Sequence, residues 1–304
     1  MYAQYYNLMK EPFHITPDPE FLFLSDAHKE ALATIIYGVE QRKGFIAIIG
    51  EVGLGKTTIL RSFLDRVDEA RTRIIYLFNS NISFKSLLQS IYQNLGHAVE
   101  SDDVVEMVNR LHQILIDYYK AGHNVVLVID EAQNMPVRTL ENLRMLSNLE
   151  TSTDKLIQIV FSAQPEFEQK LKSYELRQLK QRIAIKATIT PFNEQESIAY
   201  IRHRLMKAAG DEVEIFTKGA LKQIARHAEG IPRLINVVCD NCLITGFGCQ
   251  QKIVPAQTVK NIIAELEQKE KKPVPVWLTL VLAVVILGAG ALGIWTLLNQ
   301  TSLH

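Results

Sequence analysis

The sequence predicts an α/β fold in which helices cover both faces of a parallel sheet, followed by an all-helical region and one apolar helix. Three observations lead to this prediction. Apolar runs typical of buried strands alternate with helical patterns up to residue 191. The pattern is then helical throughout residues 192–268. Finally, residues 276–298 form a run of 23 residues that contains no charged side chain.

The composition is that of a globular protein, with 47% hydrophobic and 22% charged residues. It excludes a disordered chain and a small disulfide scaffold. The 33 basic residues balance the 33 acidic residues, so the chain as a whole lacks the positive charge typical of nucleic-acid binding. Three cysteines cannot all pair within one chain, which fits a reducing compartment.

The elements of the α/β region follow one another in alternation. Ser25 is expected to cap a helix that ends at Arg42. Strands are predicted at 45–49, 74–78, 124–129, 156–162 and 183–190, and further helices at 56–67, 84–96, 102–121, 137–149 and 165–174. In the predicted strand 124–129 (NVVLVI), the residues after Asn124 are continuously apolar, as expected of a strand that is buried on both faces of a parallel sheet.

Pro191 and Phe192 end this alternation, and the helical pattern that follows has turns near Gly210, Gly230 and residues 246–248. The predicted organisation is a nucleotide-binding α/β domain at 1–191, a helical lid domain at 192–268, a charged linker at 269–275, a membrane helix at 276–298 and a short tail at 299–304.

The apolar run at 276–298 is long enough to span a bilayer, because a helix of this length measures about 34 Å against roughly 30 Å of hydrocarbon. Trp277 and Trp295 flank it, as aromatic residues do at membrane interfaces. The basic residues just before it are Lys269, Lys271 and Lys272. No Lys or Arg follows it, so the charge rule predicts a single-pass protein of the inner membrane with its N-terminal part in the cytoplasm. A buried core helix is the alternative.

A glycine-rich segment, residues 50–58 (GEVGLGKTT), lies between a predicted strand and a predicted helix and matches G-x-x-x-x-G-K-[ST]. Its glycines allow backbone conformations that aim N–H groups at phosphate oxygens. Lys56 can reach the β- and γ-phosphates, and the Thr57 hydroxyl can bind Mg²⁺. The nucleotide contacts predicted in this segment are Gly50, Glu51, Val52, Gly53, Leu54, Gly55, Lys56, Thr57 and Thr58.

Asp130 and Glu131 follow the apolar strand at 124–129. Asp130 is expected to hold the metal together with Thr57, directly or through water. Glu131 is expected to polarise the water that attacks ATP. We expect adjacent strands to bring these carboxylates and the glycine-rich segment to the carboxyl edge of one sheet.

These motifs resemble those of the AAA+ ATPases, P-loop NTPases with three αβα layers and a helical lid. The resemblance implies that Arg233, in the segment GIPR at 230–233, contacts the γ-phosphate from the lid. Ser162 or Gln164, after the fourth strand, would be the polar group that senses the phosphate.

The same resemblance implies that an arginine before the fifth strand reaches the ATP site of a neighbouring subunit. Arg182 is preferred for this role and Arg177 is the alternative. Asn79 would be the residue that restrains Glu131. The residues with expected catalytic roles are therefore Lys56, Glu131, Arg182 and Arg233.

A narrower resemblance covers nearly all of residues 1–268. The segments YYNLMKEPFHITPDPEFLFLS, HKEAL, GFIAIIGEVGLGKTT, DEAQNM and AQPEFEQKL are similar to those of the general secretion pathway protein A-like ATPases. This resemblance implies a membrane-tethered ATPase that uses ATP and Mg²⁺, self-associates through its ATP sites and serves secretion, pilus or polysaccharide machinery of the inner membrane. It also implies that the N-terminal stretch lies beside the adenine, where Phe13, Ile15 and His28 could line the pocket.

The alternative is a DNA-associated AAA+ regulator of the transposition or initiator type. The zero net charge and the apolar run disfavour it, and a nucleic-acid partner is not expected.

Overall fold

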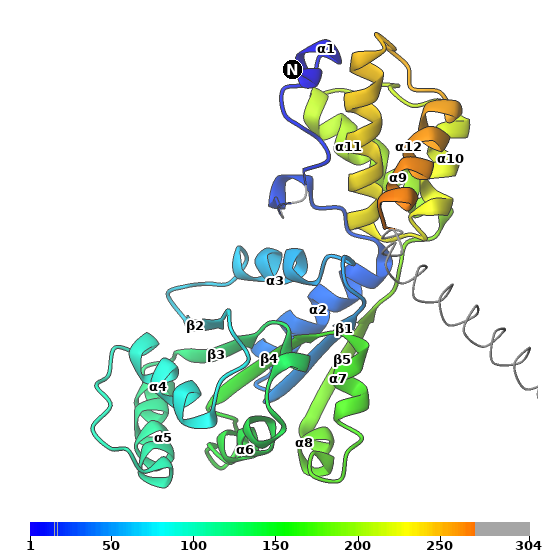
Figure 1. Ribbon diagram of the computed structural model, residues 1–304. Helices are drawn as coiled ribbons and strands as arrows, with labels where there is room; N and C mark the ends of the chain where they lie inside the picture. The colour runs from blue at the N-terminus through cyan, green and yellow to red at the C-terminus, as the bar shows by residue number, and fades with distance from the viewer. Residues whose placement is uncertain (15, 17, 271–304) are drawn as a thin grey trace, which may run out of the picture. The chain divides into compact units, whose positions relative to one another are not determined.

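The structure is a computed structural model that describes residues 1–14, 16 and 18–270. The chain forms two compact units, Met1–Val259 and Lys260–His304. The first unit contains a parallel sheet with its helices and the helices α9–α11 (Figure 1).

The sheet region begins with short N-terminal turns and then alternates strand and helix. The elements are α1 Tyr2–Tyr5, η1 Pro19–Phe21, α2 Asp26–Glu40, β1 Phe45–Gly50, α3 Lys56–Leu64, β2 Thr72–Leu77, α4 Phe84–Asn94, α5 Val104–Lys120, β3 Asn124–Ile129, η2 Ala132–Asn134, α6 Val137–Ser147, β4 Ile157–Ala163, α7 Pro165–Lys170, α8 Arg177–Arg182 and β5 Ile183–Ile189. The predicted parallel α/β fold is confirmed. The short elements α1, η1, η2 and α8 are additions to it.

The five strands have the order β2-β3-β4-β1-β5, and all are parallel. The expectation that the strands preceding the glycine-rich segment and the carboxylates are adjacent is therefore wrong, because β4 lies between β1 and β3. The physical reason is that β4 is buried along its whole length and must be covered on both edges and both faces.

Alternate residues of the central strands enter two apolar layers. Phe45, Ala47 and Ile49 of β1 belong to a core shared with α4–α8. Ile46 and Ile48 belong to a second core shared with α2 and α3. Both faces of the sheet are thus buried, as Figure 1 shows from the helices above and below it.

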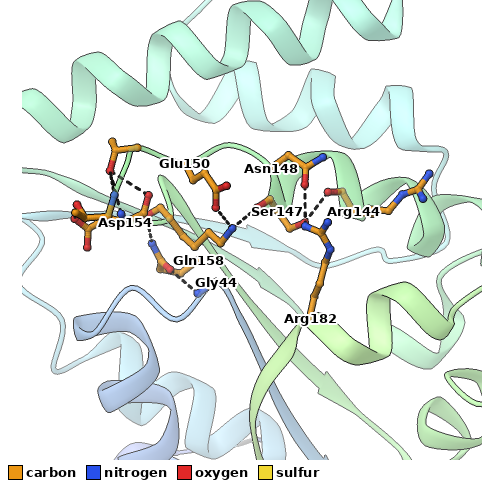
Figure 2. Close-up of polar contacts among 11 residues, drawn as sticks. Gly44, Arg144, Ser147, Asn148, Glu150, Asp154, Gln158 and Arg182 are labelled. Carbon is orange, nitrogen blue, oxygen red and sulfur yellow. Dashed lines mark hydrogen bonds and ion pairs between the residues drawn. The ribbon is translucent and has the colours of Figure 1, made fainter.

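The amino ends of three strands are tied together by Gln158, whose side chain is fully buried. Its Oε1 accepts the N–H of Gly44 at 3.0 Å, and its Nε2 donates to Asn124 Oδ1 at 3.1 Å and to Lys155 O at 3.0 Å. Asn124 in turn donates to the Val39 carbonyl at 3.0 Å. Figure 2 shows Gln158 bonded to Gly44 at this end of the sheet. Through its further bond to Asn124, this one neutral side chain joins the starts of β1, β3 and β4.

The helical region contains α9 Glu194–Ala209, α10 Lys218–His227, α11 Pro232–Gly248 and α12 Ala256–Glu270. The chain turns after α9 at Gly210 and before α11 at Gly230, both with positive φ. A side chain at Gly230 could not be accommodated, because its Cβ would lie 1.9 Å from the Phe192 carbonyl oxygen. The predicted turn at 246–248 begins later, since α11 continues to Gly248.

The first residues of the chain contact the helical region, although the sequence assigned them to the α/β domain. The Tyr2 hydroxyl donates to Asp240 at 2.5 Å and the Tyr6 hydroxyl to the Gln251 carbonyl at 2.9 Å. Figure 1 shows α1 beside α11.

Within residues 1–14, 16 and 18–270, no helix combines the length and the apolar character needed to cross a bilayer. The membrane helix predicted at 276–298 lies outside the described residues, as do the end of the linker and the tail at 299–304. These parts of the organisation stay predictions.

Candidate functional site

The glycine-rich segment connects the end of β1 to the start of α3, and its glycines are required for different reasons. Gly53 and Gly55 have φ of +83° and +88°, a region that favours glycine. Gly50 has no positive φ, contrary to the expected backbone role. A Cβ there would instead lie 3.1 Å from the Ile189 carbonyl oxygen of β5.

Lys56 begins α3 with its side chain buried. Its Nζ donates to the carbonyl oxygens of Gly50 at 2.8 Å and Glu51 at 3.0 Å. Burial lowers the pKa of Lys56, while the nearby carboxylates, led by Glu131, oppose that shift. The ammonium thus lies inside the loop on neutral oxygens that phosphate oxygens could replace.

The Asp130 carboxylate is the most heavily hydrogen-bonded group of the site. Its Oδ2 accepts from Thr57 Oγ1 at 3.1 Å and from the Tyr76 hydroxyl at 3.0 Å. Its Oδ1 accepts from Ser162 Oγ at 2.6 Å and from the Glu131 N–H at 2.9 Å. The carboxylate and the Thr57 hydroxyl form an oxygen donor set of the kind that Mg²⁺ prefers, so these residues fit the expected metal.

Glu131 has φ of +50°, and its side chain is held by two amides. Its Oε2 accepts from Gln133 Nε2 at 2.5 Å and from Gln164 Nε2 at 2.9 Å. The N–H of Gln164 donates to Gln133 Oε1 at 3.1 Å, which links the two glutamines. The Glu131 carboxylate is therefore oriented from two elements, η2 and the end of β4.

Ser162 and Gln164, the two candidates for the phosphate-sensing group, have different partners in the structure. Ser162 is fully buried on Asp130, whereas Gln164 reaches Glu131. Asn79 is exposed, and its Oδ1 accepts the N–H of Asn81 rather than contacting the Glu131 carboxylate.

Tyr76 and Gln133 are site residues that sequence reasoning missed. Burial, reinforced by Asp130, raises the pKa of Tyr76, so its hydroxyl stays a donor at neutral pH. Gln133 lies two positions after Glu131, in the quoted segment DEAQNM, and its spacing was a usable signal. Nothing in the alternation of β2 distinguished Tyr76 from the other half-buried residues of that strand.

A cavity of about 440 Å³ opens over the glycine-rich segment, within the size range of small-ligand sites. Arg233 lines it, and its backbone N–H donates to the Gly53 carbonyl at 3.3 Å. Val52, Lys56, Thr57, Thr58, Glu131, Phe192, Tyr200 and Asn236 also line it. Residues of the helical region and of the glycine-rich segment thus line the same cavity.

Of the three residues expected beside the adenine, His28 lines this cavity. Phe13 is buried against Phe216 instead, with ring centroids 6.4 Å apart. Ile15 lies outside the described residues.

Arg177 and Arg182 lie on α8, before the amino end of β5, whereas the glycine-rich segment follows the carboxyl end of β1. Arg182 donates to Ser147 Oγ and, at 2.8 Å, to Asn148 Oδ1 (Figure 2). Arg177 is exposed and stacks on Tyr174 at 4.9 Å. Arg182 is therefore held within its own chain, and Arg177 is the more accessible arginine.

Comparison with known proteins finds a matching domain family and a similar protein. Residues 39–171 match the AAA domain family AAA_22. Over 248 residues the chain is 40% identical to general secretion pathway protein A of Aeromonas hydrophila, covering 81% of this chain and 45% of the relative. The chain thus spans just under half the length of that relative.

Solved structures share the fold at low identity. The Aeropyrum pernix ORC2 protein in ADPNP–ADP complexes has a TM-score of 0.57 at 15% identity, covering 79% of this chain and 67% of that chain. Drosophila ORC bound to DNA has a TM-score of 0.61 at 17% identity, covering 88% and 66%. The Thermotoga maritima RuvB Holliday junction branch migration motor has a TM-score of 0.52 at 16% identity, covering 84% and 74%. The chain therefore contains an AAA domain at residues 39–171 and is a homologue of general secretion pathway protein A.

Proposed function

We propose that this chain binds ATP with Mg²⁺ and hydrolyses it to ADP and phosphate. The observation that carries the proposal is the 3.1 Å contact between Thr57 Oγ1 and Asp130 Oδ2. It joins the start of α3 to the end of β3, so a phosphate-binding loop and a carboxylate pair share one site.

Thr57 and Asp130 would hold the metal, which supplies positive charge to the phosphate oxygens when bound. The backbone N–H groups at the start of α3 bind phosphate, aided by the helix dipole. Lys56 exchanges the carbonyl oxygens of Gly50 and Glu51 for phosphate oxygens. These contacts fix the triphosphate in one position.

Glu131 acts as the general base. Its carboxylate takes a proton from the water whose oxygen attacks the γ-phosphorus, and the bond to the ADP oxygen breaks. Gln133 and Gln164 orient this carboxylate, and the position of Gln164 supports it as the residue that responds to the γ-phosphate. Ser162 supports Asp130.

Arg233 would contact the γ-phosphate from the lid and stabilise its developing charge. An arginine of α8 would act on the ATP site of a neighbouring copy of the chain. The exposure of Arg177 supports it for this role; Arg182 would first have to leave Ser147 and Asn148.

In the cell, we propose an accessory ATPase of inner-membrane secretion machinery, with pilus and polysaccharide systems as related clients. The identity to general secretion pathway protein A supports this setting. The apolar run at 276–298 would tether the chain, with the ATPase part in the cytoplasm.

Phosphate release by the full-length chain tests the activity. The wild type should hydrolyse ATP only with Mg²⁺, whereas Lys56→Ala and Glu131→Gln should not. Equal turnover by all three proteins would reject the proposal. Alkaline extraction of membranes tests the tether, since a spanning helix at 276–298 would keep the chain in the membrane pellet.

A further inference from the structure

His28 of α2 contacts the glycine-rich segment from outside the motif. Its ring is 4% exposed, with Nε2 2.8 Å from the Leu54 carbonyl oxygen and Nδ1 2.6 Å from Ser25 Oγ. The ring also packs against Phe192, with centroids 5.3 Å apart. Contacts on three sides therefore fix the orientation of this imidazole.

The partners of the ring assign its proton. A carbonyl oxygen can only accept, so Nε2 carries the hydrogen that bonds to Leu54. In a neutral ring Nδ1 then accepts from the Ser25 hydroxyl. Burial lowers the pKa of His28, which favours this neutral form.

The bond to Leu54 has a consequence for the neighbouring amide. The Leu54 carbonyl and the Gly55 N–H belong to one planar trans peptide, in which the C=O and N–H bonds point in opposite directions. Holding the carbonyl therefore fixes the direction of the N–H. The Leu54 side chain, 1% exposed, anchors the same peptide in the core under the loop.

Gly55 is fitted to this arrangement. It has φ of +88°, and a Cβ there would lie 3.3 Å from His28 Nε2. The left-handed backbone favours glycine at this position, and any other residue would also press its Cβ against the imidazole.

We propose that His28 is a positioning residue of the nucleotide site, whose Nε2–H holds the Leu54–Gly55 peptide so that the Gly55 N–H faces the bound phosphates. This inference rests on the proposed nucleotide site. It predicts that His28 affects the binding of phosphates whether or not the ligand carries an adenine.

Titration calorimetry of the full-length chain with ADP and with inorganic tripolyphosphate tests the role. His28→Leu removes the donor and should weaken the binding of both ligands by about tenfold. This is the cost of losing one hydrogen bond between the Gly55 N–H and a charged phosphate. His28→Gln, which keeps an N–H donor, should stay within about threefold of the wild type.

His203→Leu is the matched control, because His203 is a partly buried histidine of α9 that is not among the described residues lining the cavity. It should bind both ligands as the wild type does. Thermal melts of all variants set a temperature at which each is folded, and binding is measured there.

Two results would overturn the role of His28 while leaving the proposed function intact. One is that His28→Leu binds both ligands with the affinity of the wild type, while Lys56→Ala does not bind them. The other is a loss of affinity for ADP while the affinity for tripolyphosphate is unchanged, which would mean that His28 contacts the adenosine part of the nucleotide. Failure of the wild type to bind either ligand would instead reject the proposed function.

Discussion

The two ends of the sheet are both rich in buried polar groups, but they use them differently. At the amino ends, Gln158 is neutral, and its amide bonds to the chain at Gly44, Asn124 and Lys155. At the carboxyl ends, Lys56 and Asp130 are buried groups that carry charge, held by carbonyls and hydroxyls.

The comparison separates structural polar groups from functional ones. A neutral amide with all its partners in the chain stabilises one arrangement of strands and offers nothing to a ligand. A buried charge on neutral partners is costly unless an opposite charge is supplied. Bound nucleotide and metal would supply it at the carboxyl end.

The largest expected effect is at Glu131. Glu131→Gln removes the base but keeps the size of the side chain, so turnover should fall by roughly 10²–10⁴-fold while ATP affinity stays within about threefold. Phosphate release and ATP titration measure the two quantities. Glu69→Gln, an exposed acid, is the control. Normal turnover of Glu131→Gln would show that the polar groups at the carboxyl end of the sheet do not include the general base.

Lys56→Ala should weaken ATP binding by about 2–5 kcal/mol, because a buried cation no longer meets the phosphates. Its thermal stability should change little. Lys43→Ala, at the other end of β1 and exposed, should bind ATP normally. Equal affinities of the two variants would contradict the charge argument.

Gln158→Leu should destabilise the chain by about 2–4 kcal/mol, because it leaves the Gly44 N–H, the Asn124 Oδ1 and the Lys155 carbonyl without their partner. Denaturant unfolding measures this. The folded variant should keep its ATP affinity, and Gln178→Leu, at an exposed glutamine, should cost under about 0.5 kcal/mol. A stable Gln158→Leu variant with impaired ATP binding would reverse the proposed distinction.

Gln164→Ala should lower turnover by about threefold to tenfold, since the Glu131 carboxylate loses one of its two donors. ATP affinity should be unchanged, and the fall should be smaller than that of Glu131→Gln. An unchanged kcat with a raised KM would assign Gln164 to substrate binding instead.

The smallest effect concerns pH. The folded pKa of His28 is below its ordinary value, so the unfolded chain binds more protons and stability falls as pH drops below about 6.5. His28→Gln should weaken this dependence, measured by denaturant unfolding between about pH 7 and pH 5.5. The exposed His97→Gln should not weaken it.

Local features of the fold were predictable because they depend on local patterns. Residues 124–129 form β3 as predicted, since a short run of β-branched and other apolar residues is typical of a strand at the centre of a parallel sheet. Ser25 caps α2 as predicted, because its hydroxyl accepts the His28 N–H. The glycine-rich segment lies between β1 and α3 because its motif includes its own turn.

The order of the strands was not predictable in the same way. Whether β4 or β3 neighbours β1 depends on long-range pairing, for which the single sequence carries no periodic signal. The same is true of Tyr76, whose contact with Asp130 exists only after the strands assemble, and of the choice between Ser162 and Gln164 as the partner of Glu131. The sequence named Lys56, Asp130 and Glu131 together with their neutral partners Thr57, Ser162 and Gln164, but it missed Tyr76 and Gln133.

Because β4 lies between β1 and β3, the sheet sets the distance between the glycine-rich segment and the carboxylates. Two strand intervals of about 4.8 Å separate the backbones that carry Lys56 and Asp130. A substitution inside β4 that widened or twisted the sheet would therefore move Lys56 away from Asp130 without altering either residue. A substitution in the interior of β4 is therefore expected to change the reaction rate as well as the stability of the fold.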